Sequence, residues 1–124
     1  MNLTKSEEQL MELFWNNEGS LTSVDIVNMK FKPTWSSGLV QNMIRSLIKK
    51  NALQLCGTKQ YGTQYARELA PAITREEYAA QLILNAGFSQ LSISKVIAAL
   101  AEDAGSKDDV IEQLEAIIKQ LKEE

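Results

Sequence analysis

The sequence contains no histidine, one cysteine and two prolines in 124 residues. Without histidine, the Ser-His-Asp triad and imidazole acid–base catalysis are excluded. The single cysteine, Cys56, has no internal disulfide partner, and spacings typical of zinc ligands are absent. No apolar run approaches the roughly 18–20 residues that a membrane-spanning helix needs. The first ten residues are polar, unlike a secretory signal. We therefore expect a cytoplasmic protein that is not an enzyme, does not enter a membrane and requires neither metal nor other cofactor.

The composition is that of an ordinary folded chain, but its charges are distributed unusually. Apolar residues make up 44% and charged residues 23%, as in globular domains. The net charge is −3, but residues 26–67 contain seven basic side chains and no acidic one, while the flanking segments are acidic. Such a block suits a polyanion, whose phosphates supply most of the attraction. The alternative is a solvated basic surface without a partner.

Several helix starts are visible as capping boxes, in which a hydroxyl and a carboxylate satisfy free backbone amides. Thr4–Glu7 predicts a first helix that ends at Gly19, and Thr22–Asp25 predicts a short second helix to about residue 29. Pro33 prevents the second helix from continuing. Thr74–Glu77 predicts a later helix that ends near residue 87.

A third helix is predicted from an N-cap at Ser36 to about Lys50. Its apolar stripe consists of Val40, Met43, Ile44, Leu47 and Ile48. The opposite side carries amides and bases, which is unusual for a merely solvated face: Gln41, Asn42, Arg45 and Lys49. A helix of about 14 residues is roughly 21 Å long and fits the major groove of DNA.

The polar residues at the start and on the outer side of this third helix suit particular contacts to DNA. Gln41 and Asn42 have the donor and acceptor that recognise adenine, and Arg45 contacts either guanine or a phosphate. Ser36, Ser37 and the helix N-terminus suit a phosphate. Further contacts to the DNA backbone are expected from Lys49 and Lys50. The alternative is an ordinary surface helix of a small α/β domain.

A β-hairpin is predicted directly after this helix. Residues 52–56 and 63–68 are prone to form strands, and the glycine-bounded segment between them predicts a tip that presents Lys59 and Gln60. The order helix, helix, helix, strand, strand indicates a winged helix-turn-helix, a mainly α fold of the α+β class. Leu21 is a candidate for a short third strand, and Trp35 is expected in the core rather than stacked on a base.

The remaining chain predicts a helical dimerisation region. We expect residues 1–72 to form the winged helix-turn-helix domain and residues 73–124 to form three short helices with little core of their own. Helices of this kind need a partner, and a symmetric homodimer supplies one. The apolar residues expected in the dimer interface are Phe88, Leu91, Ile97, Leu100, Val110, Leu114, Ile117 and Leu121.

The sequence resembles the penicillinase-repressor family of bacterial transcription factors (BlaI/MecI/CopY-like). The resemblance rests on an ordered set of segments: LTKSEEQLMELFW, LTSVDIV, TWSSGLVQNMIRSLIKKNAL, ITREEY, LSISKVIAALAED and VIEQLEAIIKQL. It implies a homodimeric winged-helix repressor that binds an inverted-repeat operator. The residues that would face the operator are Ser37, Gln41, Asn42 and Arg45, with Lys59 on the wing.

The chain departs from this family in three respects. Ser37 and Gly38 replace the common proline and basic residue after the cap serine, and Leu39 replaces a small polar residue. The C-terminal cysteine cluster of the copper-responsive members is absent. The Asn–Phe bond cleaved in the β-lactam-responsive members has only Gly87-Phe88 as its nearest match. A winged-helix protein-interaction module without sequence-specific DNA binding is therefore the alternative function.

Overall fold

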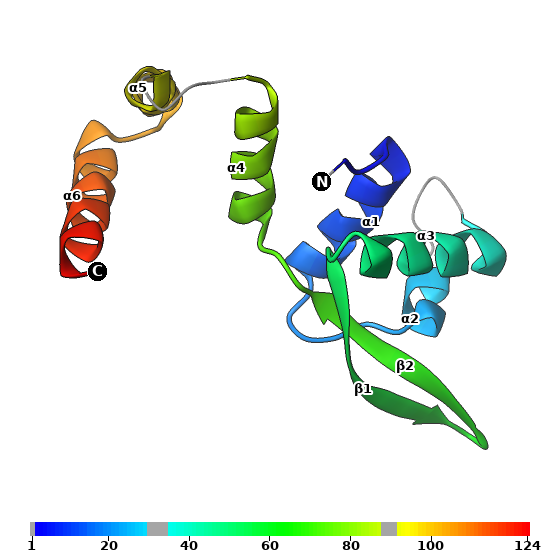
Figure 1. Ribbon diagram of the computed structural model, residues 1–124. Coiled ribbons are helices and arrows are strands. Elements are labelled where there is room, and N and C mark those ends of the chain that lie inside the picture. The colour runs from blue at the N-terminus through cyan, green and yellow to red at the C-terminus, as the bar shows by residue number, and fades with distance from the viewer. Residues whose placement is uncertain (1, 30–34, 88–91) are drawn as a thin grey trace. The chain divides into compact units, whose positions relative to one another are not determined.

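The computed structural model describes residues 2–29, 35–87 and 92–124. The chain divides into two compact units, Met1–Gln81 and Leu82–Glu124. The first unit contains three helices, a two-stranded antiparallel sheet and the start of a fourth helix (Figure 1). Their bounds are α1 Lys5–Asn16, α2 Ser23–Asn28, α3 Ser37–Lys49, β1 Leu53–Tyr61, β2 Gln64–Pro71 and α4 Arg75–Asn85. The predicted winged-helix fold of mainly α class is confirmed.

The predicted helix starts are confirmed by their hydrogen bonds. Thr4 and Glu7 form a complete capping box before α1, and Thr22 and Asp25 form one before α2. Ser36 caps α3 by accepting a hydrogen bond from the backbone N–H of the third helical residue. These bonds satisfy amides that a helix N-terminus otherwise leaves without partners. Local sequence therefore determines where each of these helices begins.

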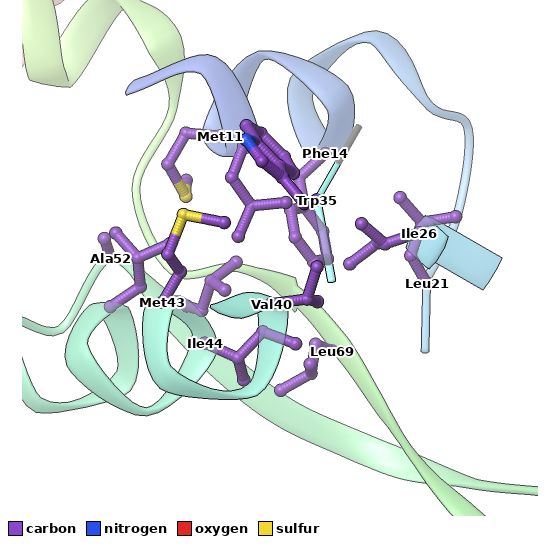
Figure 2. Close-up of a cluster of buried hydrophobic side chains, with 13 residues drawn as sticks. Met11, Phe14, Leu21, Ile26, Trp35, Val40, Met43, Ile44, Ala52 and Leu69 are labelled. Carbon is purple, nitrogen blue, oxygen red and sulfur yellow. The ribbon is translucent and has the colours of Figure 1, made fainter. Parts of the chain in front are cut away.

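The core of the first unit lies between α1, α3 and the base of the hairpin (Figure 2). Phe14 from α1 and Val40 and Leu47 from α3 are at most 1% exposed. Trp35 is 8% exposed and belongs to this core, as predicted. Among the described residues, the buried cluster comprises Leu10, Met11, Phe14, Leu21, Ile26, Trp35, Val40, Met43, Ile44, Leu47, Ala52, Leu53 and Leu69. Because the apolar stripe of α3 faces this core, its polar side faces solvent.

The hairpin is longer and its tip is narrower than the sequence predicted. Strand β1 continues through Gly57 to Tyr61, which pairs with Gln64, so the loop consists of Gly62 and Thr63. The prediction that Lys59 and Gln60 form the tip is wrong, because both lie within β1 and pair with residues of β2. Gly57 marks a register shift in the strand, where an added Cβ would lie 3.3 Å from the Glu68 carboxylate. Gly62, with φ of 61°, makes the actual turn.

At Leu21, where a short third strand was expected, the structure has a single β-bridge. Leu21 pairs with Leu69 of β2 through both of their backbone amides, at 3.0 and 2.8 Å. This bridge ties the segment before α2 to the base of the hairpin.

The second unit contains the end of α4 and two further helices, α5 Ile93–Asp103 and α6 Lys107–Glu123. Ser106 caps α6 through the backbone N–H of Asp109. Neither α5 nor α6 has a buried residue, and several of their large apolar side chains are at least half exposed: Leu100, Ile111, Ile117, Ile118 and Leu121. The expected interface residues Phe88 and Leu91 lie outside the described residues. Within the described ranges, no helix is long and apolar enough to cross a membrane.

Candidate nucleic-acid interface

The solvent side of α3 forms a continuous polar stripe. Gly38, Asn42, Arg45 and Lys49 follow one another at spacings of three or four residues, which places them on one side of an α-helix. All four are exposed, and they lie opposite the buried apolar stripe. No carboxylate lies on α3, and its last turn ends with Lys49. The stripe therefore presents amide and cationic groups along the length of the helix.

The N-terminal tip of α3 is polar, small and open. Ser36 Oγ accepts a hydrogen bond of 3.2 Å from the Leu39 N–H, and Ser37 is exposed. An added Cβ at Gly38 would meet no atom within 4 Å. The backbone φ of Gly38 also lies outside the region that favours glycine. The fold itself does not require glycine here. The missing side chain leaves the backbone of the first helical turn accessible to a ligand.

Gln41 lies on the flank of α3 that faces α2 and the hairpin. Its Nε2 donates a hydrogen bond of 2.9 Å to Ser23 Oγ. Both residues line a groove of about 300 Å³ between these elements, together with Tyr65 and Arg67 of β2. The Gln41 amide is thus directed toward Ser23, whereas Asn42 on the outer stripe has no such bond in the described part of the chain.

Tyr65 and Arg67 are two candidate contacts that sequence reasoning missed. Tyr65 is 69% exposed, and Arg67 is exposed with no ion-pair partner among the described residues. They alternate along β2 with Leu69, which is buried against the core, so all three point to the same face of the sheet. The alternation of these residues along β2 is visible in the sequence and predicts that they share one face of the sheet. It does not predict a groove on that face, because the groove also depends on the position of α3.

Lys59 lies on the other face of the hairpin. It pairs with Ala66, the residue before Arg67, and neighbouring residues of a strand point to opposite faces. Its Nζ is 3.8 Å from Asp25 Oδ1 and lies over the Tyr61 ring at 5.2 Å from the centroid. Lys59 is thus separated from the groove that contains Gln41, and Asp25 offsets part of its charge.

The hydroxyl of Tyr61 joins the same cluster at the start of α2. It donates a hydrogen bond of 2.9 Å to Asp25 Oδ1 and lies 2.7 Å from Thr22 Oγ1. Burial acts to raise the pKa of Asp25, but hydrogen bonds from the Thr22 backbone and from Tyr61 outweigh it, with help from the charge of Lys59, and lower the pKa. The carboxylate therefore stays ionised, and the cluster fixes the hairpin to α2.

Lys50 has a structural partner, unlike its neighbour Lys49. Its Nζ lies 2.6 Å from Oε1 of Glu7, a residue that is only 3% exposed. The sequence grouped Lys50 with Lys49 as a contact to the DNA backbone, but the structure directs Lys50 toward α1. The cations near α3 and the groove that lack an ion-pair partner in the described residues are Arg45, Lys49 and Arg67.

The structure thus brings most of the predicted site residues together on one helix. Ser36, Ser37, Gln41, Asn42, Arg45 and Lys49 are all exposed at the cap or along α3. Lys59 is exposed but lies on the hairpin face beside α2. Cys56 is an exposed thiol on β1. In the described parts of the chain, acidic and cysteine side chains form no group of three that could hold a metal ion.

A comparison with protein families matches residues 3–120 to the family described as penicillinase repressor. A search among curated proteins finds no match. The matched segment includes all of the first unit except its first two residues, and all of the second unit except its last four.

Proposed function

This chain belongs to the penicillinase repressor family, a family of DNA-binding transcriptional regulators, and we propose that it represses transcription as a homodimer on a palindromic operator. The sequence resemblance predicted this family. The proposed setting is the cytoplasm of a bacterial cell, with double-stranded DNA as the partner.

The polar stripe on α3 is the observation that supports DNA binding most directly. Asn42, Arg45 and Lys49 are exposed on a helix that carries no carboxylate. The groove beside α3 adds Arg67, which forms no ion pair with the part of the chain that the structure describes. We assign base contacts to Asn42 and Arg45, since an amide suits adenine and a guanidinium suits guanine. Lys49, Arg67 and the α3 N-terminus with Ser36 and Ser37 would contact phosphates. Gln41 and Lys59 would support this surface from its edges.

The exposed apolar side chains of α5 and α6 support the homodimer. Leu100 and Leu121 are each 62% exposed, and Ile117 is 50% exposed. These residues belong to the predicted dimer interface, as do Ile97, Val110 and Leu114, which are partly buried. Burial of such side chains against a second copy stabilises the assembly by about 25 cal/mol per Å² of apolar surface. Twofold symmetry then requires two half-sites one helical turn, or a multiple of it, apart on the DNA.

Selection of bound sequences from random duplex DNA by the full chain tests this function. We expect an inverted repeat to be enriched, with adenine in the positions that Asn42 contacts. Asn42→Ala is expected to relax selection at those positions, whereas Gln9→Ala, an exposed amide on α1, serves as the control and leaves the consensus unchanged. Failure to enrich any sequence would contradict the proposal and favour a protein-interaction module.

A further inference from the structure

The start of α2 is bonded both to α3 and to the hairpin. Ser23 Oγ accepts a hydrogen bond of 2.9 Å from the amide of Gln41 on α3. The preceding residue, Thr22, is 0% exposed, and its Oγ1 lies 2.7 Å from the hydroxyl of Tyr61 on β1. Two consecutive residues of the chain thus connect α3 and the hairpin through the start of α2.

The capping box of α2 supplies both partners of the Tyr61 hydroxyl. Asp25 Oδ2 accepts the Thr22 N–H at 2.9 Å, and Thr22 Oγ1 accepts the Asp25 N–H at 3.2 Å. The second carboxylate oxygen, Asp25 Oδ1, accepts the Tyr61 hydroxyl at 2.9 Å. Since that proton goes to Asp25, the Thr22 hydroxyl donates to the Tyr61 oxygen. The box is complete without Tyr61, so these two bonds serve the hairpin rather than the start of the helix.

The other contacts of the hairpin to the segment before α2 are at its base. Leu21 pairs with Leu69, and the Ser20 hydroxyl donates a hydrogen bond to the Glu68 carboxylate. Tyr61, in contrast, is the last residue of β1 and pairs with Gln64 across the turn. A two-stranded hairpin is at best marginally stable by itself and needs packing against another element. The Tyr61 hydroxyl therefore holds residues 58–67, which we call the outer half of the hairpin.

The outer half of the hairpin carries the groove residues of β2. Tyr65 pairs with Gln60 and Arg67 pairs with Thr58. Tyr65 and Arg67 line the groove that also contains Gln41 of α3. Side chains and loops that are ordered before binding lose less conformational freedom when the complex forms. The position of the outer half therefore affects how tightly this surface binds a ligand.

We propose that the Tyr61 hydroxyl, through Thr22 and Asp25, holds the outer half of the hairpin in place for DNA, with Tyr65 and Arg67 beside α3 before the duplex binds. This inference rests on the proposed operator binding. Tyr61 is a positioning residue, because it lies two residues from Lys59 and shares the hairpin face opposite to Tyr65 and Arg67.

Tyr61→Phe tests the proposal, since it removes the hydroxyl and keeps the ring that lies under Lys59. Tyr78→Phe is the matched control: its hydroxyl donates to Glu8 Oε1, also at 2.9 Å, and joins α4 to α1 instead. Both variants keep the aromatic ring and should retain the fold, which circular dichroism checks. ¹⁵N relaxation of the free chain measures the order of the hairpin backbone. Fluorescence anisotropy measures affinity for the selected operator, with and without Arg67→Ala.

We expect order parameters of about 0.85 for residues 58–67 in the wild-type chain and in Tyr78→Phe, and values below about 0.6 in Tyr61→Phe. Tyr61→Phe should bind the operator about fivefold more weakly, as the loss of one hydrogen-bonded position predicts, and Tyr78→Phe should bind as the wild type does. Arg67→Ala should weaken binding about fivefold in the wild-type chain and less than twofold in Tyr61→Phe, because Arg67 is then no longer held in place.

An ordered hairpin or unchanged affinity in Tyr61→Phe would overturn the proposal. A full effect of Arg67→Ala in the Tyr61→Phe chain would also overturn it, because the hydroxyl would then not act through the groove face. An equal loss of affinity in Tyr78→Phe would assign the effect to general destabilisation and would likewise contradict the proposal. These outcomes all require a wild-type chain that binds DNA. If the wild-type chain binds no duplex, the proposed function fails, and this proposal fails with it.

Discussion

Glu7 in the first turn of α1 and Lys50 at the end of α3 form an ion pair of 2.6 Å. The Glu7 carboxylate also accepts hydrogen bonds from the Ser46 hydroxyl at 2.6 Å and the Thr4 N–H at 2.8 Å. Burial acts to raise the pKa of Glu7, but these bonds and the charge of Lys50 outweigh it and lower the pKa from 4.5 to about 2. The same carboxylate thus caps α1 and holds α3, the helix of the proposed DNA contact.

The first prediction concerns this carboxylate. Because its pKa is lower in the folded chain than in the unfolded chain, its contribution is complete above about pH 4.5 and is lost as the pH falls toward 2. We expect Glu7→Gln to lower the free energy of unfolding by about 2–3 kcal/mol at pH 7, and by less at pH 3. Urea denaturation at both pH values measures the difference, with the exposed Glu18→Gln as control. An equal loss at both pH values would contradict the role of the charge.

The second prediction separates the two faces of the hairpin. Arg67 lacks an ion-pair partner in the described chain, whereas Lys59 lies 3.8 Å from Asp25. We expect Arg67→Ala to weaken operator binding and to reduce the slope of log K against log salt by about 0.9, the value of one lost phosphate contact. Lys59→Ala should weaken binding and flatten the slope by less than half of that amount. Titrations in rising salt measure both slopes, and a larger effect of Lys59→Ala would show that the other face contacts DNA.

The third prediction is that one substitution, Gly38→Ala, raises the stability of the fold but weakens DNA binding. Gly38→Ala has room for its Cβ, so it should raise the free energy of unfolding by about 0.5–1 kcal/mol, the usual gain in a helix. If the first turn of α3 approaches DNA closely, the same methyl group should weaken operator binding several-fold. Denaturation and anisotropy measurements check the two effects. Gly105→Ala, which also has open space around the added Cβ, should leave DNA binding unchanged; unchanged affinity of Gly38→Ala would place the DNA elsewhere.

The fourth prediction concerns the homodimer. Leu114→Asp places a charge in the predicted apolar interface of α6, and we expect it to give monomers by sedimentation velocity with weak operator binding. Gln113→Asp adds the same charge at an exposed polar position of the same helix and should stay dimeric. If the Leu114→Asp variant stays dimeric in sedimentation velocity, the predicted role of Leu114 in the interface is wrong and other residues hold the dimer.

Local signals in the sequence predicted much of this fold. The caps Thr4, Thr22 and Ser36 and the apolar stripe of α3 depend on neighbouring residues only, so their helices followed directly from spacing. The hairpin tip was misplaced because a glycine in a bulge and a glycine in a turn give the same local signal. The residues between Gly57 and Gly62 pair with β2, so Gly57 lies within the strand and Gly62 lies in the turn. This pairing depends on the opposite strand and cannot be predicted from the glycines themselves.

The candidate site was predicted less completely for the same reason. The residues of α3 share one helix, and their common face follows from helical periodicity. The positions of Lys50, Lys59 and Arg67 depend on contacts with distant elements: a buried carboxylate on α1, an acidic residue on α2 and a groove beside α3. Charge along the chain identified all three as basic but did not indicate which of them has an acidic partner.

The most direct test of the account is the salt dependence of duplex DNA binding by the full chain. We expect the wild-type protein to bind its selected operator with a steep negative slope of log K against log salt. The Arg45→Ala/Lys49→Ala/Arg67→Ala variant, with native helix content, should reduce that slope by roughly two to three. Equal slopes for both proteins, or no binding by the wild-type chain at low salt, would contradict DNA recognition through α3 and its groove.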